Sequence, residues 1–158
     1  MTNSSIPELS EQEAQEGLHF ARTSSRCRHP KIIHKPGDEL NQVFNFITLN
    51  SYMQPHMHPG DEKIEEIFLV KGRVAIFYFN DSGNILQIIE LNKAGVDRVK
   101  VPAYTWHTYV MMEDEVITFE TMMGKYDPAT WKFMAPWAPK EMDLSSSLYL
   151  NELRNALK

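Results

Sequence analysis

Short segments with the alternating pattern of β-strands follow one another through the middle of this chain, and this feature most restricts its fold. The segments span residues 43–49, 64–71, 73–79, 85–91, 98–101, 107–112 and 116–122. Most begin about eight to twelve residues after the previous one, and turn residues such as Asp81, Ser82 and Gly83 separate them. Strands this short and this close together predict a mainly β fold, a sandwich or a barrel, rather than alternating strands and helices.

Two helices are expected outside these strands. The first spans about residues 10–22, because Ser10 can cap it and Glu13 stands three positions later, as in a capping box. The second starts at about Ser146, where leucines recur at intervals of three and four. A chain of 158 residues has the length of one domain. We divide it into a leader and helix (1–22), a strand-rich region (23–125), and a proline- and aromatic-rich tail with the second helix (126–158).

Charge and hydropathy argue against two classes of partner. The chain carries 16 Lys and Arg against 21 Asp and Glu, a net charge of −5 without a basic cluster, which argues against nucleic acid. Its longest apolar run, Val74–Phe79, is far shorter than the roughly 20 residues of a membrane-spanning helix. The polar N-terminus lacks the apolar segment of a signal peptide, and Cys27 is the single cysteine, so we expect a cytoplasmic protein.

Three of the six histidines suggest a metal site. His56 and His58 are two positions apart, so on a strand both side chains point to the same side. Glu65 begins a later strand, and His107 begins another after a turn. Three imidazoles and one carboxylate suit one divalent transition metal, which could be Fe, Mn, Ni, Zn or Cu. The His-x-His pair alone is weak evidence, since such pairs also occur on solvated strand edges.

The spacing of these residues resembles the cupin superfamily. Pro55-His56-Met57-His58, Glu65 and Gly72 resemble its first motif, and Gly95, Pro102 and His107 resemble its second. The segment Pro102-Ala103-Tyr104-Thr105-Trp106-His107 and the tail around Tyr126-Asp127-Pro128 and 135–139 are similar to the WbuC-type cupin-fold metalloproteins. The resemblance extends from about residue 22 to residue 141. It implies a single cupin β-barrel, or jelly roll, at 23–125, with His56, His58, Glu65 and His107 as the metal ligands.

Two positions depart from the cupin pattern. Six residues separate His58 from Glu65, more than is common in cupins, so Glu62 at the common spacing is a rival ligand. The interval to Gly72 favours Glu65, which also lies on a strand, whereas Glu62 lies in a charged loop. Tyr104 stands where the pattern has glycine. If the turn requires a positive φ there, the tyrosine must be strained or the turn altered.

Four further residues are candidates for a pocket beside the metal. Arg28, like Arg26, could bind a phosphate or carboxylate, although a solvated connector explains both arginines equally well. His34 could line the pocket mouth, since WbuC-type chains have a similar histidine there, but a packing or capping role is preferred. Tyr104 is expected to be an exposed turn residue that could also lie beside the pocket, and Trp106 could form a pocket wall. No general base can be assigned from the sequence.

The ligand set and the resemblance together indicate what the protein could do. A metal with an open coordination position can act as a Lewis acid. The first hypothesis is therefore an enzyme, an isomerase or epimerase, that acts on a small oxygen-rich molecule such as a sugar derivative in surface-polysaccharide metabolism. A non-catalytic module that binds or senses a small ligand is the alternative, and an Fe(II)-dependent dioxygenase is a third possibility. The resemblance also implies a homodimer, because cupins commonly pair through edge strands.

Overall fold

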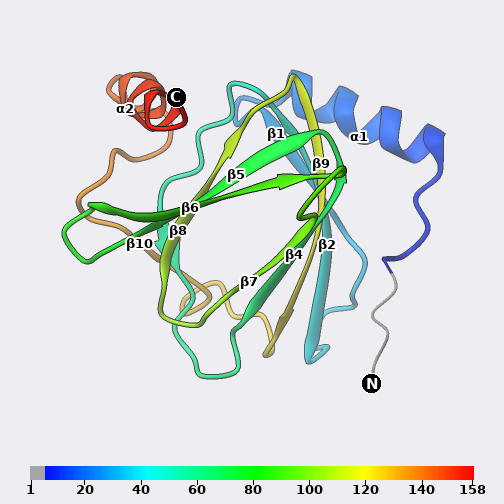
Figure 1. The fold of residues 1–158 in the computed structure, drawn as a ribbon. Coiled ribbons are helices and arrows are strands. Elements are labelled where there is room, and N and C mark those ends of the chain that lie inside the picture. The colour runs from blue at the N-terminus through cyan, green and yellow to red at the C-terminus, as the bar shows by residue number, and fades with distance from the viewer. Residues whose placement is uncertain (1–5) are drawn as a thin grey trace.

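The computed structural model describes residues 6–158, which form two antiparallel sheets with a helix at each end of the chain (Figure 1). The helices are α1 (Glu11–Thr23) and α2 (Ser146–Asn155). The strands are β1 (Arg28–Ile32), β2 (Leu40–Thr48), β3 (His56–Met57), β4 (Glu65–Lys71), β5 (Arg73–Phe79), β6 (Ile85–Asn92), β7 (Arg98–Val101), β8 (Trp106–Met111), β9 (Glu115–Met123) and β10 (Phe133–Met134). The first sheet has the order β1-β2-β9-β4-β7, and the second has the order β10-β3-β8-β5-β6.

The predicted mainly β fold with two terminal helices is confirmed. Ser10 caps α1 through a capping box with Glu13, and α2 begins at Ser146, as the sequence indicates. All seven expected strands are present, with ends that differ by three residues at most. The first five residues of the expected leader lie outside the described part of the chain. Neither helix of residues 6–158 has the length and apolar character that a membrane crossing requires.

Three strands were not expected from the sequence. β1 begins at Arg28, two residues after Arg26, although a solvated connector explained both arginines equally well in the sequence. β1 contains Pro30, which an edge strand tolerates because one side of that strand needs no backbone donor. β3 and β10 have two residues each, too few to show an alternating pattern.

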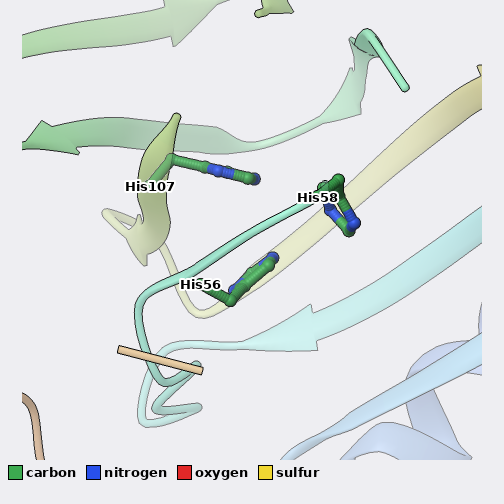
Figure 2. Close-up of side chains that lie close together, drawn as sticks. All are labelled: His56, His58 and His107. Carbon is green, nitrogen blue, oxygen red and sulfur yellow. The ribbon is translucent and has the colours of Figure 1, made fainter. Parts of the chain in front are cut away.

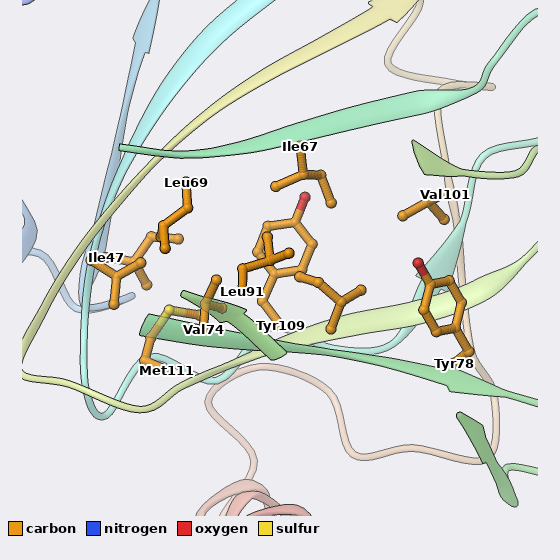
Figure 3. Packing of buried hydrophobic residues seen from close by; sticks show 11 residues of the cluster. Ile47, Ile67, Leu69, Val74, Tyr78, Leu91, Val101, Tyr109 and Met111 are labelled. Atoms are coloured by element: carbon orange, nitrogen blue, oxygen red, sulfur yellow. The ribbon is translucent and has the colours of Figure 1, made fainter. Parts of the chain in front are cut away.

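Alternation along the strands builds a layered structure with α1 on one outer face and α2 on the other. On β5, Val74, Ile76 and Tyr78 belong to the core between the sheets, where Figure 3 shows Val74 and Tyr78. The alternate residues of β5, Ala75, Phe77 and Phe79, pack with Leu150 and Leu153 of α2. On the opposite sheet, α1 packs through Leu18 and Ala21 against Phe44, Phe46 and Phe119. Both sheets are therefore covered on their outer faces, which explains the nearly continuous apolar runs of the central strands.

The space between the sheets is apolar over one part and polar over the other. Ile47, Leu69 and Met111 belong to the apolar core. Side chains alternate along a strand, so a residue two or four positions from one of these core residues points into the same space between the sheets. The polar residues on this inner face are Asn45 of β2, Glu65 of β4, His107 and Tyr109 of β8 and Glu120 of β9. The polar part of the interior is where the candidate site lies.

Gly72 joins β4 to β5 and provides a test of the fold. Its φ is +85°, and a Cβ added to it would lie 2.4 Å from the carbonyl oxygen of Glu115. Gly72→Ala is therefore expected to lower the free energy of unfolding by about 2–4 kcal/mol, from the left-handed backbone and the clash with a backbone atom together. Denaturant unfolding measures this loss. The matched control is Gly95→Ala, because the Gly95 site has no atom within 4 Å; equal stability of the two variants would contradict the prediction.

Candidate metal centre

His56, His58 and His107 converge between the two sheets (Figure 2). His56 lies in β3, His58 follows that strand, and His107 lies in β8, which pairs with β3 so that His56 is directly opposite His107. The three side chains are buried, and one ring nitrogen from each lies within 4.8 Å of the others. The predicted grouping of a His-x-His pair with a histidine from a distant strand is thus present in the structure.

The orientation of the three rings is fixed by backbone carbonyls. Nδ1 of His56, His58 and His107 lies 2.9, 3.0 and 2.8 Å from the carbonyl oxygens of Gln54, Trp131 and Thr105, respectively. A carbonyl only accepts hydrogen bonds, so each Nδ1 carries a proton and each ring directs its Nε2 away from that carbonyl. The Nε2 atoms of His58 and His107 are buried and make no well-aligned hydrogen bond among the described residues. Histidines that bind metals are oriented by such contacts at the opposite ring nitrogen.

Glu65 is the carboxylate that the structure brings to these histidines. Its Oε2 lies 3.0 Å from Nε2 of His58, and its Oε1 lies 3.6 Å from Nε2 of His107. Burial opposes ionisation of Glu65, but His107 and His58 hold the pKa of this carboxyl well below its ordinary value. A carboxylate that faces two nitrogen lone pairs in a buried site requires a cation between them, either a proton or a metal ion.

Burial also keeps His56 neutral, which is the form that binds metals. Together with the charges of His107 and Lys132, burial lowers the pKa of His56 well below 6.5. The donor set is therefore three oriented imidazoles and one ionised carboxylate, which fits a divalent transition metal. Glu62, the rival ligand, is exposed in the loop before β4, and its carboxylate lies near Gly60 instead.

A cavity of about 280 Å³ opens beside the histidines and extends along the polar part of the interior. Its lining includes His56, His58, Glu65, Arg28 and Trp131. Of the four pocket candidates from the sequence, Arg28 lines this cavity and His34, Tyr104 and Trp106 do not. Arg28 is buried and donates to Ser51 Oγ and the carbonyl of Tyr52, both at 3.2 Å, so it is not a solvated connector.

The other three pocket candidates have contacts elsewhere. His34 accepts the backbone N–H of Gln42 on Nδ1 at 2.9 Å, which is a structural contact near the start of β2. Trp106 donates its indole N–H to Asp81 at 3.0 Å, on the outer side of β8. Tyr104 is exposed and has a φ of +58°, so the turn keeps the left-handed backbone of the glycine in the cupin pattern.

Sequence reasoning missed an acidic residue that lines the same cavity. The Tyr109 hydroxyl contacts both Glu65 Oε1 and Glu120 Oε1, and the Asn45 amide donates to the other oxygen of Glu120. Tyr109 has one proton for two carboxylates, so a second proton is needed, and Glu120 is the group placed to carry it. Burial and the charge of Glu65 raise the pKa of Glu120 to about 8. Tyr109 belongs both to the apolar core and to the cavity wall.

Glu120 should make the stability of the metal-free protein depend on pH. Because folding raises its pKa from 4.5 to about 8, its contribution is complete below pH 4.5 and is lost as the pH rises through 8. Between pH 4.5 and 8, we expect the free energy of unfolding of wild type to fall by about 2–3 kcal/mol relative to that of Glu120→Gln. This is less than the whole pKa shift would give, because Glu120 is partly accessible to solvent. Denaturant unfolding of chelator-treated protein measures this difference. Glu62→Gln, at an exposed site, is the control, and parallel curves for wild type and Glu120→Gln would refute the prediction.

The fold and the inward-facing polar cavity define a cupin-fold protein, and comparison with solved structures agrees. DddQ from Ruegeria pomeroyi, a DMSP lyase, matches with a TM-score of 0.56 at 16% identity over 84% of this chain and 62% of that one. Residues 9–91 match the family described as a domain of unknown function, DUF6016, and the chain belongs to this family. No curated protein matches the sequence.

Two further cupin structures show the same fold. CapF from Staphylococcus aureus, a capsular polysaccharide assembling protein, matches with a TM-score of 0.54 at 18% identity over 66% of this chain. KdgF from Halomonas sp. matches with a TM-score of 0.50 at 19% identity over 65% of this chain and 83% of that one. This chain spans about a third of CapF, 31% of its length, so the match concerns one part of that protein.

Proposed function

We propose that this protein is a metal-dependent enzyme that acts on a small oxygen-rich molecule, such as a sugar derivative. The observation that carries the proposal is the arrangement of His56, His58 and His107, whose Nδ1 atoms are held by carbonyls while the opposite nitrogens face Glu65 and each other. Their location at a cavity, rather than in a closed cluster, favours a site with a position for substrate.

The chemistry follows from the groups around the cavity. His56, His58, Glu65 and His107 would hold one divalent transition metal, and when bound it would supply Lewis acidity to a substrate oxygen. Glu120 presents a carboxyl group that holds its proton near neutral pH, so it can donate or accept a proton at the substrate. Tyr109 positions this carboxyl group by contacting both Glu120 and Glu65. A Lewis acid beside a proton carrier suits isomerisation or epimerisation at a carbon next to a carbonyl.

The finer assignment concerns the branch of the superfamily. We propose a WbuC-type cupin in surface-polysaccharide metabolism, on the residues of the segment 102–107 and of the tail 135–139. The likeness to CapF, a capsular polysaccharide assembling protein, supports this direction through the fold. The same proposal includes a cytoplasmic homodimer with a barrel at 23–125 between the N-terminal helix and the tail at 126–158. Light scattering of the purified protein would measure the oligomeric state.

Deuterium exchange tests the proposed reaction. Protein reconstituted separately with Mn²⁺, Zn²⁺, Ni²⁺ or Fe²⁺ is incubated in D₂O with a panel of aldoses, uronic acids and sugar nucleotides, and nuclear magnetic resonance detects deuterium at carbon. An isomerase or epimerase is expected to exchange deuterium with several of these metals and without O₂. His107→Ala, which removes a proposed ligand, is the inactive control. Activity with iron and O₂ alone would indicate the dioxygenase instead, and tight ligand binding without turnover under every metal would indicate the binding module.

A further inference from the structure

Three cationic side chains line the cavity next to the metal centre. They are Arg26, Arg28 and Lys132. Arg26 lies just before β1, Arg28 begins β1, and Lys132 lies just before β10, so two segments far apart in the sequence provide them. Like charges collected at one cavity repel each other and are costly unless anions accompany them.

One carboxylate accompanies the two arginines. Glu141 accepts from Arg26 Nε at 2.9 Å and from a second Arg26 nitrogen at 3.2 Å, and it also pairs with Arg28. Glu65 also lines the cavity as an ionised carboxylate, but it faces His58 and His107, so three cations still exceed the two carboxylates. Glu120 does not remove this excess. It shares the single Tyr109 hydroxyl proton with Glu65, and its pKa is raised to about 8, so its carboxyl group is mostly protonated near pH 7.

Among residues 6–158, the Lys132 ammonium group makes no ion pair or hydrogen bond, and Glu141 and Glu65 act on it only through their charges. Much of Lys132 is exposed, but desolvation where it lines the cavity, followed by the charges of Arg28 and Arg26, lowers the pKa of its ammonium group. The protein therefore holds a lysine near two arginines without a partner for it. A bound anion would stabilise this arrangement.

The backbone around Lys132 is tied to the metal centre. The carbonyl of the preceding residue, Trp131, accepts from Nδ1 of His58, and the following residue, Phe133, pairs with Met57 between the two histidines of the His-x-His pair. Lys132 is thus held at a fixed position along the edge that presents His56 and His58. A ligand that reaches both the lysine and the metal centre needs only the size of a small metabolite, which agrees with a cavity of about 280 Å³.

We propose that the cavity binds a small organic anion, a carboxylate or a phosphate monoester, with its anionic group on Lys132 beside Arg26 and Arg28 and another of its oxygens directed at the metal centre. The contact with the metal rests on the proposed function, whereas the anion contact does not. Arg28 is held by its protein contacts and shapes the wall, so Lys132 provides the free donor. The substrate would then be an acidic sugar, a hydroxy acid or a sugar phosphate rather than a neutral sugar.

Calorimetric titration of metal-loaded protein tests this inference with three matched probes. They are glycerate, which carries a carboxylate, glycerol 3-phosphate, which carries a phosphate, and neutral glycerol. We expect wild type to bind one or both anions at least about 10-fold more tightly than glycerol, the range of one charge-assisted hydrogen bond. Lys132→Met should remove this preference without changing the metal content, and Lys132→Arg should keep most of it. Lys125→Met, which removes an exposed lysine 3.7 Å from Glu39, should have no effect.

The outcomes separate this inference from the proposed function. Equal anion binding by wild type and Lys132→Met, or anion affinity no greater than that for glycerol in wild type, would overturn the anion site. The anion site would also be overturned if neither anion binds wild type at millimolar concentration. Wild type that cannot be loaded with metal would overturn the metal centre instead. Anion binding to metal-free protein that depends on Lys132 would still support the anion site in that case. The stronger of the two anionic probes identifies the class of ligand.

Discussion

Replacing His107 with alanine is expected to leave the purified protein without stoichiometric metal. His107 has no exposed surface, and the Thr105 carbonyl fixes its ring so that Nε2 faces the other ligands. Loss of a partner that only orients a ligand weakens metal binding about 10–100-fold, so loss of a ligand should weaken it by roughly 100-fold or more. Elemental analysis gives the metal content, and titration of chelator-treated protein with Zn²⁺ or Mn²⁺ gives the affinity. His56→Ala should behave in the same way.

Two controls accompany the His107→Ala variant. His19→Ala removes an exposed histidine on α1 and should keep full metal content. Circular dichroism of each variant shows whether the fold is retained, since His107 is buried within β8. A folded His107→Ala protein with the metal content and affinity of wild type would disprove the metal centre as we describe it.

The second large effect is expected at Glu65. Glu65→Gln keeps the size of the side chain but removes the charge that faces His58 and His107, so we expect metal affinity to fall by roughly 100-fold. Glu62→Gln is the matched control, because it makes the same change three residues earlier at an exposed position. The two variants are compared in the same titration with Zn²⁺ or Mn²⁺.

Comparison of Glu65→Gln with Glu62→Gln also decides which carboxylate completes the ligand set. Metal loss in Glu62→Gln with full binding by Glu65→Gln would reverse our choice of ligand. Unchanged binding in both variants would mean that the three histidines hold the metal without either acid. In that case the role of Glu65 would be limited to its contact with Tyr109.

Most of the fold could be predicted from the sequence, because the central strands have an alternating pattern of side chains. Val74 to Phe79 alternate between two buried faces and lie between clear turns, so their limits could be predicted. β1 could not, because pairing with β2 stabilises it and four of its five residues are Arg, His, Pro and Lys. β3 and β10 are formed by tertiary contacts over two residues each. No local pattern of that length distinguishes a strand from a loop.

The candidate site was predictable to the extent that its residues have a spacing in the sequence. His56 and His58 lie two apart, and His107 follows a turn, so they could be selected before their contacts were known. Glu120 and Lys132 could not be selected. An acid within an alternating strand usually lies on the solvated face, and a single exposed lysine in a proline- and aromatic-rich tail carries no signal for a pocket. Only the pairing of β9 with its neighbours places Glu120 inside.

The short ladder between β3 and β10 has a consequence for how the protein assembles. Because the Trp131 carbonyl sets the ring of His58 and β10 hydrogen-bonds to β3, the C-terminal tail must be docked before the ligand geometry is complete. Metal binding should therefore stabilise the docked tail, and the docked tail should raise the affinity for the metal. If the centre holds a metal ion, chelation should loosen the C-terminal tail, and removal of β10 should weaken metal binding without any change to the ligands.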